Sequence, residues 1–403
     1  MNMKPIMIVM LAISLGFFTT AKAQETTITL KEAVEIAKKN YPSIKAAQLE
    51  VDKQKILKQT SWDLGNTLIY TGMEEVGNES DGVQTKIGIG QQDIDIFSIP
   101  TKNNLVNSRT KLAQTKQDLT ETSLIRDVHI AYYRASFTYQ QYQLLIHIDT
   151  LYSDFLKAAE LRYKTQQTSR IEYLAASSRY KALQLNLRKA EGNYKATIEI
   201  LNQFLMMPSK INIDVNSTLN SIDYAGSFDD SLFTSPLLKY YANATEMAES
   251  NWKAHKAGYF PKINLSYARQ NVDGASGFYA YQAGISFPFL SFDQNGKTKA
   301  AKLDYQIAAQ TYEEKVLETS ASYKKDLINL NALQDVLDYF NNEALPLANE
   351  QIEATNLAYR LGSIDYVQFI QNIETAINTK SEYLQQQLNY LELLAEIKYL
   401  AGI

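Results

Sequence analysis

The chain has 403 residues, among them 16 glycines and 8 prolines, and its formal net charge is −4. So few turn-forming residues predict long uninterrupted elements rather than a string of compact domains. The absence of cysteine excludes disulfides, thiolate metal sites and a lipid-modified N-terminal cysteine, and the acidic balance argues against a nucleic-acid partner.

The first 23 residues have the pattern of a secretory signal peptide. Lys4 supplies a positive start, residues 6–18 are apolar, and Ala21-Lys22-Ala23 forms a small-x-small cleavage site. The apolar segment is shorter than the roughly 18 to 20 residues that a spanning helix needs. We therefore expect residues 1–23 to be cleaved on export rather than kept as a membrane anchor.

The mature sequence predicts two repeats of one plan, residues 24–220 and 221–403. The first repeat opens with a Thr29/Glu32 capping box and a short helix, followed after Pro42 by a second helix that reaches about Trp62. The second repeat has the same break at Thr234-Ser235-Pro236, before a helix that reaches about Ala257.

Each repeat next changes from a helical to an alternating period, which predicts β-hairpins at about 65–98 and about 261–290. In the second hairpin the apolar set alternates with small or polar residues: Ile263, Leu265, Tyr267, Tyr279, Tyr281, Ala283, Ile285 and Phe287. The first hairpin has a fainter apolar set: Leu68, Tyr70, Val83, Thr85, Ile87 and Ile89. Strands of about ten residues with one apolar face suit an outer-membrane barrel, although a soluble hairpin has the same pattern.

After each hairpin the helical period returns and persists. Leu105, Leu112 and Leu119 are seven residues apart, and residues 101–161 would form a helix on the order of 90 Å long. The corresponding run of the second repeat includes Tyr366, Ile370, Ile373, Ile377, Leu384, Leu388, Leu391 and Ala395. Long periodic runs of this kind indicate coiled-coil-like packing.

Four strands cannot close a barrel, and an open sheet edge cannot face lipid because its amides would be unsatisfied. If the hairpins are embedded in a membrane, several protomers must combine them. Three copies would supply twelve strands, with the antiparallel helices continuing as a wall below them.

Several short motifs recur in order along nearly the whole mature chain. They are Leu30-Lys31-Glu32-Ala33-Val34-Glu35-Ile36-Ala37, Asn40-Tyr41-Pro42-Ser43, Ser235-Pro236-Leu237-Leu238, Ala257-Gly258-Tyr259-Phe260-Pro261, Phe287-Pro288-Phe289-Leu290 and Leu345-Pro346-Leu347-Ala348. No single motif is specific, but their order, spacing and duplication resemble the TolC-like outer-membrane efflux protein family.

The resemblance implies a mainly α fold with a small β part, in which each repeat has long antiparallel coiled-coil-like helices and one β-hairpin. It implies a homotrimer with a 12-stranded outer-membrane β-barrel and a periplasmic α-helical barrel. The implied function is a passive exit duct, not an enzyme, that exports small molecules or metal ions. The implied partners are a periplasmic adaptor protein, an inner-membrane pump of the resistance-nodulation-division type and outer-membrane lipid.

The resemblance also places two helix–turn–helix tips, at residues 162–169 and 359–363, as the periplasmic gate and the adaptor contact. The candidate residues are Tyr163, Gln166, Ser169, Glu172, Tyr359, Leu361, Gly362, Ser363 and Asp365. Gln166 stands where the family usually has glycine, and Gln368 stands where a carboxylate is usual. The run from Leu361 to Tyr366 is similar to the branch paired with heavy-metal-exporting pumps rather than the multidrug branch.

Most of these tip residues have a purely structural alternative. Ser169 and Glu172 fit a capping box as well as a gate in which three carboxylates surround an axis. Asp365 fits either a ring at the entrance or a first-turn acid, and Gly362 fits a turn position with positive φ. Tyr163 and Tyr359 suit interhelical packing or a brace of the closed tip.

Other residues predict an aromatic girdle and argue against a metal or catalytic site. Five aromatic residues fall at predicted strand ends: Tyr259, Phe260, Phe278, Phe287 and Phe289. The histidines are scattered at His129, His147 and His255, and Met206-Met207 point to different helix faces. We expect no catalytic residues, no cofactor and no metal site.

Two other classes of protein share parts of the pattern. A periplasmic adaptor also has coiled-coil hairpins, but with Gly- and Pro-rich flanking domains that are missing from this sequence. A secreted coiled-coil structural protein would not need the two alternating hairpins. The sequence does not disclose the cargo or the identity of the pump and adaptor.

Overall fold

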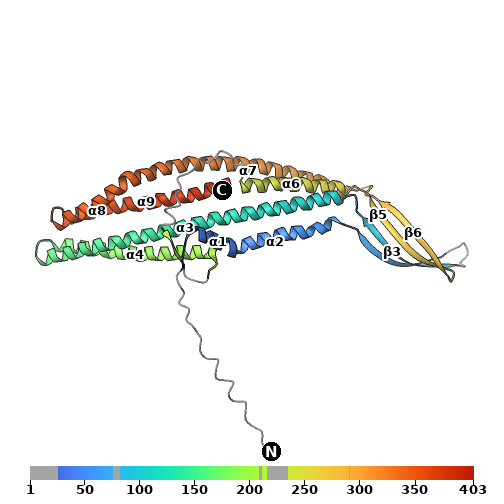
Figure 1. The fold of residues 1–403 in the computed structure, drawn as a ribbon, viewed down its shortest axis with the longest axis horizontal. Helices are drawn as coiled ribbons and strands as arrows, with labels where there is room; N and C mark the ends of the chain where they lie inside the picture. The colour runs from blue at the N-terminus through green and yellow to red at the C-terminus, as the bar shows by residue number, and fades with distance from the viewer. Residues whose placement is uncertain (1–25, 76–81, 208–210, 216–234, 290) are drawn as a thin grey trace, which may run out of the picture.

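The computed structural model describes residues 26–75, 82–207, 211–215, 235–289 and 291–403. The predicted signal peptide, the repeat boundary at residues 220 and 221, Thr234 and Leu290 lie outside the described residues. The molecule is elongated, with a β-sheet at one end and long helices that run away from it (Figure 1).

The helices and strands follow the predicted plan twice. The first repeat contains α1 (Leu30–Asn40), α2 (Pro42–Ile56), a 3₁₀ turn (Leu57–Ser61), β2 (Asn66–Glu75), β3 (Val83–Ile94), α3 (Ile99–Lys164) and α4 (Arg170–Leu205). The second contains α6 (Pro236–Ala257), β5 (Lys262–Val272), β6 (Ala275–Ser286), α7 (Phe292–Tyr339), α8 (Leu345–Arg360) and α9 (Tyr366–Ala401). The predicted fold class of long antiparallel helices with one hairpin per repeat is confirmed.

Local chemistry explains where the helices begin. Thr29 and Glu32 form the predicted capping box at the start of α1. Proline lies in the first turn of α2 and α6, where its missing N–H has no helical acceptor to lose. Pro346 instead follows a π-turn at Phe340–Ala344, which joins α7 to α8 without ending the helix.

One small sheet was not predicted. Strand β1 (Thr26–Ile28) pairs in parallel with β4 (Ile211–Ile213). The buried Tyr132 hydroxyl donates to the carbonyl oxygens of Ile28 at 2.9 Å and Asp214 at 3.0 Å. Strands of three residues have no measurable period, so the sequence pattern could not reveal them.

The larger sheet has the strand order β2-β3-β5-β6, with every neighbouring pair antiparallel. Its register places the predicted apolar residues of β5 and β6 on one face, together with Ile87 and Ile89 of β3. Small and polar residues occupy the other face: Gly88, Gly90, Asn264, Ser266, Ala268, Ala280, Gln282 and Gly284.

The prediction for β2 was wrong about the side chains that share the apolar face. Leu68 pairs with Gly90 and Tyr70 with Gly88, so both lie on the small and polar face. Ile69, which pairs with Ile89, lies on the apolar face instead and is 74% exposed. The error is a one-residue slip in register, which exchanges the two faces of a strand.

Gly88 is required where Tyr70 crosses the small and polar face. A Cβ at Gly88 would lie 2.5 Å from Tyr70 Cζ and 2.9 Å from the Tyr267 carbonyl oxygen, which cannot swing away. We expect Gly88→Ala to destabilise the sheet by about 1 to 3 kcal/mol. The measurement is protease resistance of the sheet after refolding into detergent micelles.

The matched control is Gly284→Ala on the same face. A Cβ there meets no atom within 4 Å, so the variant should be as resistant as the parent protein. Equal losses of protease resistance in Gly88→Ala and Gly284→Ala would show that Tyr70 and the Tyr267 carbonyl are not the reason why position 88 must be glycine.

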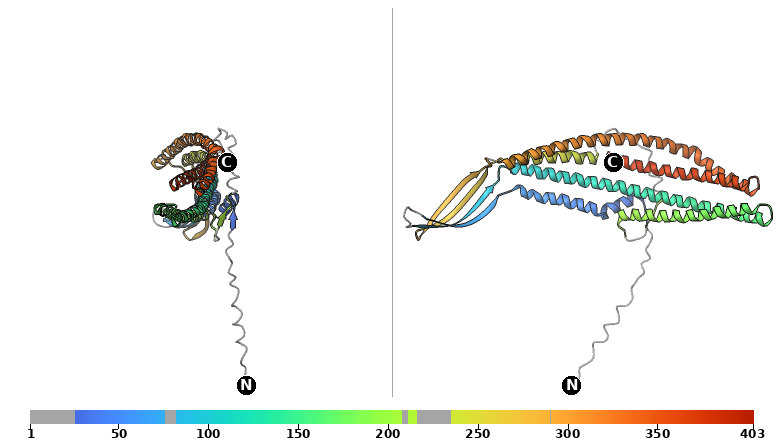
Figure 2. Two further views of the ribbon diagram at one scale, coloured as in Figure 1. Left: turned by 90° about the vertical axis from the view of Figure 1, so that its left-hand side faces the viewer. Right: turned by 180° about the vertical axis from the view of Figure 1, so that it is seen from behind.

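The helices form one curved layer. Below the sheet, α2, α3, α6 and α7 lie side by side in that order, and farther away α4, α3, α9 and α8 do the same. Seen along the long axis, the layer is an arc (Figure 2). No helix among the described residues is both long enough and apolar enough to cross a membrane.

Candidate functional site

The helix ends farthest from the sheet contain the predicted tip residues. The turn between α3 and α4 and the turn between α8 and α9 close in the same way (Figure 1). The Gln167 amide donates to the Arg162 carbonyl oxygen at 2.8 Å, and the Ser363 amide donates to the Ala358 carbonyl oxygen at 2.9 Å. The two turns are therefore structural equivalents.

Gln166 occupies the turn position that Gly362 occupies in the other tip. Their φ angles are 58° and 76°, both in the left-handed region, so the glycine predicted to need positive φ does have it. A side chain in this region costs about 1 to 2 kcal/mol relative to glycine. The first tip thus forms the tight turn despite lacking glycine, and it carries backbone strain that the second tip lacks.

We expect Gln166→Gly to stabilise the first tip by roughly 1 kcal/mol and Gly362→Ala to destabilise the second by a similar amount. A Cβ at Gly362 would also lie 3.2 Å from an Arg162 guanidinium nitrogen. Amide hydrogen exchange in the two turns measures both effects. Faster exchange in the first turn of Gln166→Gly would contradict the assignment of strain to Gln166.

The two tips are capped differently. The Ser169 hydroxyl accepts from the Glu172 amide at 3.3 Å, but the Glu172 carboxylate does not complete the predicted capping box. Asp365 does form a complete box with Gln368, through bonds of 2.8 and 3.3 Å. The Asp365 carboxylate therefore has a capping role, and the Glu172 carboxylate is directed elsewhere.

Glu172 joins the first tip to the second. The Tyr359 hydroxyl on α8 donates to Glu172 Oε1 at 3.0 Å, and the Thr168 hydroxyl donates to Oε2. The Arg162 guanidinium lies 3.9 Å from Glu172 Oε1 and 5.3 Å from the centre of the Tyr359 ring. The Glu172 side chain is only 12% exposed, so solvent screens these contacts little.

We call Arg162, Thr168, Glu172 and Tyr359 the tip junction. Burial, reinforced by the hydrogen bond to Glu172, raises the pKa of Tyr359 to about 12. The hydroxyl consequently keeps its proton at neutral pH and remains a donor. Arg162 and Thr168 lie within the predicted tip at residues 162–169 but were not singled out, because their contacts depend on how the two repeats pack together.

An aromatic core supports the tip junction from the side of the sheet. The rings of Phe155 and Phe369 stack with centres 4.6 Å apart, and the Tyr359 ring lies 5.0 and 4.9 Å from them. Tyr359 is 3% exposed, which confirms the prediction of interhelical packing. Tyr163 is partly exposed and stacks on Tyr173 within the first hairpin.

One of the ion pairs that cross between the repeats lies next to the tip junction, on the side of the sheet. Arg179 on α4 lies 2.9 Å from Glu374 on α9. Both side chains are about half exposed, so the pair stabilises less than the tip junction does. The pair is a further contact between the first repeat and the second.

The remaining candidates form an exposed end surface. Gln166, Ser169, Leu361, Gly362, Ser363 and Asp365 are exposed in the protomer. Leu361 is 72% exposed. A single exposed leucine is ordinary on a protein surface, so exposure alone assigns no role to this end of the protomer.

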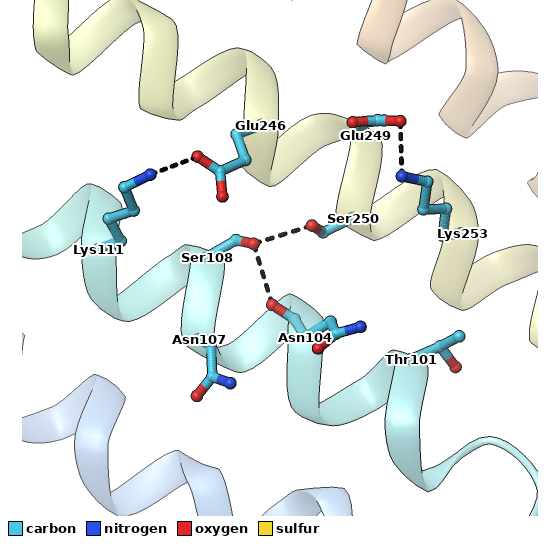
Figure 3. A pocket seen from close by; sticks show the side chains of 9 residues that line it. All are labelled: Thr101, Asn104, Asn107, Ser108, Lys111, Glu246, Glu249, Ser250 and Lys253. Atoms are coloured by element: carbon cyan, nitrogen blue, oxygen red, sulfur yellow. Dashed lines mark hydrogen bonds and ion pairs between the residues drawn. The ribbon is translucent and has the colours of Figure 1, made fainter.

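A pocket lies near the sheet, between α3 and α6 (Figure 3). Its lining groups pair with one another: the Ser108 and Ser250 hydroxyls lie 2.8 Å apart, and Lys111 lies 2.6 Å from Glu246. Both contacts join α3 to α6, so the polar groups of this pocket hold the two helices together.

The titratable groups in the helical part do not form a metal centre. Among the residues that the structure describes, no three His, Cys, Asp or Glu side chains are grouped to hold an ion. Burial and the nearby Lys398 lower the pKa of His129 to about 4, and its ring lies 5.9 Å from that of Tyr133. His129 is thus neutral and lies in a helix seam.

A comparison with protein families gives a match over the second repeat. The family model described as Outer membrane efflux protein matches residues 228–402. A comparison with curated proteins gives no match.

Solved outer-membrane channels share the whole fold. CusC is 14% identical, with a TM-score of 0.76 over 96% of this chain and 95% of that one. CmeC of Campylobacter jejuni is 12% identical, with a TM-score of 0.75 over 93% and 85% of the two chains. MtrE of Neisseria gonorrhoeae, in its open state, is 17% identical, with a TM-score of 0.72 over 93% and 88%.

These findings confirm the resemblance to the TolC-like outer-membrane efflux protein family in its second repeat and in its overall fold. The identities are low, so the solved structures establish the fold, whereas the family match concerns the second repeat.

Proposed function

We propose that this chain forms the passive exit duct of a tripartite exporter, as a trimer that pools its hairpins into one twelve-stranded barrel. The observation that carries the proposal is the four-stranded sheet with one exposed apolar face. Ile69, Ile87 and Tyr281 on that face are 74%, 64% and 76% exposed. A face of this kind is stable against lipid and unstable against water.

The edges of the sheet support the trimer. Strands β2 and β6 are the two outer strands, and each has one side without a neighbour in the protomer. Their unpaired amides could not be left facing hydrocarbon. Pairing β6 of one copy with β2 of the next satisfies them and closes the barrel after three copies.

The predicted aromatic girdle is consistent with the same placement. Phe287 and Phe289 follow the end of β6 and are 61% and 83% exposed. Phe278, near the opposite end, pairs with Gln270 and lies on the small and polar face, so it does not belong to the girdle. Aromatic rings at one end of an apolar band fit an interface of a membrane.

The tips supply the gate and the docking surface in this proposal. The tip junction holds the second helical hairpin of each protomer against the first, which narrows the end of the tube. The exposed residues around Leu361 and Ser363 contact a periplasmic adaptor, through which an inner-membrane pump of the resistance-nodulation-division type delivers its cargo. The duct itself performs no chemistry and uses no cofactor.

The resemblance of residues 361–366 to the heavy-metal branch favours metal cations as cargo over drugs. A strain lacking this chain should then lose resistance to heavy-metal cations before it loses resistance to lipophilic antibiotics. The opposite order of sensitivity would assign the duct to multidrug export.

The assembly is tested on protein extracted from outer membranes. Its mass in detergent should be three times that of the mature chain. A monomer in detergent, or recovery of the chain from the growth medium, would contradict the proposal and favour a secreted structural protein.

A further inference from the structure

The second repeat carries a basic patch directly below the sheet. Residues 249–262 and 291–302 contain six lysines but only two carboxylates, Glu249 and Asp293, although the whole chain is acidic. The corresponding stretches of the first repeat, residues 50–65 and 93–109, have equal numbers of basic and acidic residues. The positive charge is therefore a local feature of the second repeat.

Two of these lysines converge on one tryptophan. The Lys256 ammonium lies 5.2 Å from the centre of the Trp252 ring, and the Lys302 ammonium lies 5.9 Å from it. Tyr305 stacks on the same ring at 6.1 Å with an interplanar angle of 10°. We call Trp252, Lys256, Lys302 and Tyr305 the tryptophan–lysine site.

The charges of this site are not neutralised within the described part of the protomer. Lys253 and Lys297 are paired with Glu249 and Asp293, at 2.6 and 2.7 Å. Neither Lys256 nor Lys302 forms an ion pair with a described residue, and both side chains are exposed. Both ammonium groups lie within 6 Å of the centre of one ring, and each can donate to an anionic group.

The tryptophan–lysine site lies close to the sheet, at the level where lipid headgroups would be. Lys256 lies one residue before the end of α6 and six residues before Lys262, the first residue of β5. The exposed rings of Tyr259 and Phe260 lie between them. A lysine can extend toward the interface, and the headgroup layer beside the hydrocarbon is roughly 5 to 8 Å thick.

We propose that the tryptophan–lysine site binds the phosphate of an anionic phospholipid in the periplasmic leaflet of the outer membrane. The site rests on the proposed function, because the sheet must be embedded for the lysines to reach the headgroups. Lys256 and Lys302 donate to the phosphate oxygens, and the rings of Trp252 and Tyr305 lie along the interface. An assembly of three copies would have three such sites, all from the second repeat.

The chain provides its own reporter. It contains two tryptophans, so Trp62→Phe leaves Trp252 as the only source of indole emission. The full-length Trp62→Phe protein is placed in nanodiscs of phosphatidylcholine with increasing fractions of phosphatidylglycerol. We expect Trp252 emission to change with the phosphatidylglycerol fraction, because the ammonium groups leave the ring when they bind phosphate.

In the same background, Lys256→Gln with Lys302→Gln should raise the midpoint of this titration at least five-fold. The control is Lys53→Gln with Lys55→Gln on α2, whose ammonium groups are already paired with Glu50 and Asp52. An unchanged midpoint in the Lys256/Lys302 variant, an equal shift in the control, or no emission change at all would overturn the proposal.

Two further measurements distinguish a lipid site from a site for free phosphate, and a failed lipid site from a failed assembly. Inorganic phosphate added to phosphatidylcholine nanodiscs should leave Trp252 emission unchanged, and an equal response to it would assign the site to free phosphate. The mass of the nanodisc particle reports assembly independently of lipid charge. A trimer without a phosphatidylglycerol response therefore contradicts the lipid site alone, whereas a failure to form trimers contradicts the proposed function.

Discussion

Replacing Glu172 by alanine should open the periplasmic end of the duct. The substitution removes the acceptor of the Tyr359 hydroxyl and the carboxylate beside Arg162. A hydrogen bond to a charged group is worth roughly 1.5 to 3 kcal/mol, so the closed arrangement should lose about a factor of ten or more in population. Single-channel recording in planar bilayers measures the open fraction directly.

The matched control for this prediction is Gln368→Ala. Gln368 holds the equivalent place in the second tip but bonds only to its own helix cap, through Asp365. It should leave the open fraction near that of the parent channel. If Glu172→Ala and Gln368→Ala behave alike, the link between the tips is not what keeps the channel closed.

The tip junction should not respond to mild alkali. The pKa of Tyr359 is raised to about 12, so its neutral donor form is favoured in the folded state. The resulting stability is complete below the ordinary tyrosine pKa of about 10 and is lost only as the pH rises through about 12. The open fraction should stay constant from neutral to mildly alkaline pH.

Phe155→Ala should produce the largest loss of stability among single substitutions in the tip region. Phe155 is 3% exposed and its ring contacts those of Phe369, Tyr359 and Tyr152. Removing a buried phenyl ring costs about 3 to 5 kcal/mol, because a cavity remains where helices cannot collapse together. Chemical unfolding followed by tyrosine fluorescence or circular dichroism gives the difference.

Two control substitutions test whether the loss comes from the cavity that Phe155→Ala leaves. Phe155→Leu keeps most of the volume and should cost much less. Leu357→Ala, at a side chain that is 59% exposed in the protomer, should change the unfolding of a monomeric form little. A small effect of Phe155→Ala would show that the aromatic core is not what holds the two hairpins together.

The fold could be predicted well from the sequence because its apolar residues recur with a clear helical or strand period. Heptad-like spacing from Leu105 onward predicted a helix that the structure extends over 66 residues. The alternation around Tyr267 and Tyr281 identified the correct faces of β5 and β6. In β2 the alternation was too weak, since Thr67, Thr71 and Gly72 interrupt it, and the faces were exchanged.

The candidate site was predictable only in part. Tip positions such as Gly362 and Asp365 have local signals, namely positive φ and a capping box, that a sequence displays directly. The bond between Glu172 and Tyr359 joins residues 187 positions apart, so its existence depends on how the repeats pack. Thr168 and Arg162 were missed for the same reason.

The assembly itself is the central claim, and a single-particle reconstruction of protein extracted from outer membranes tests it most directly. We predict three copies around one axis, with β6 of each copy paired to β2 of the next and a lumen that continues between the helices to the tips. A particle with one or two copies, or one in which β2 and β6 remain unpaired, would contradict the account.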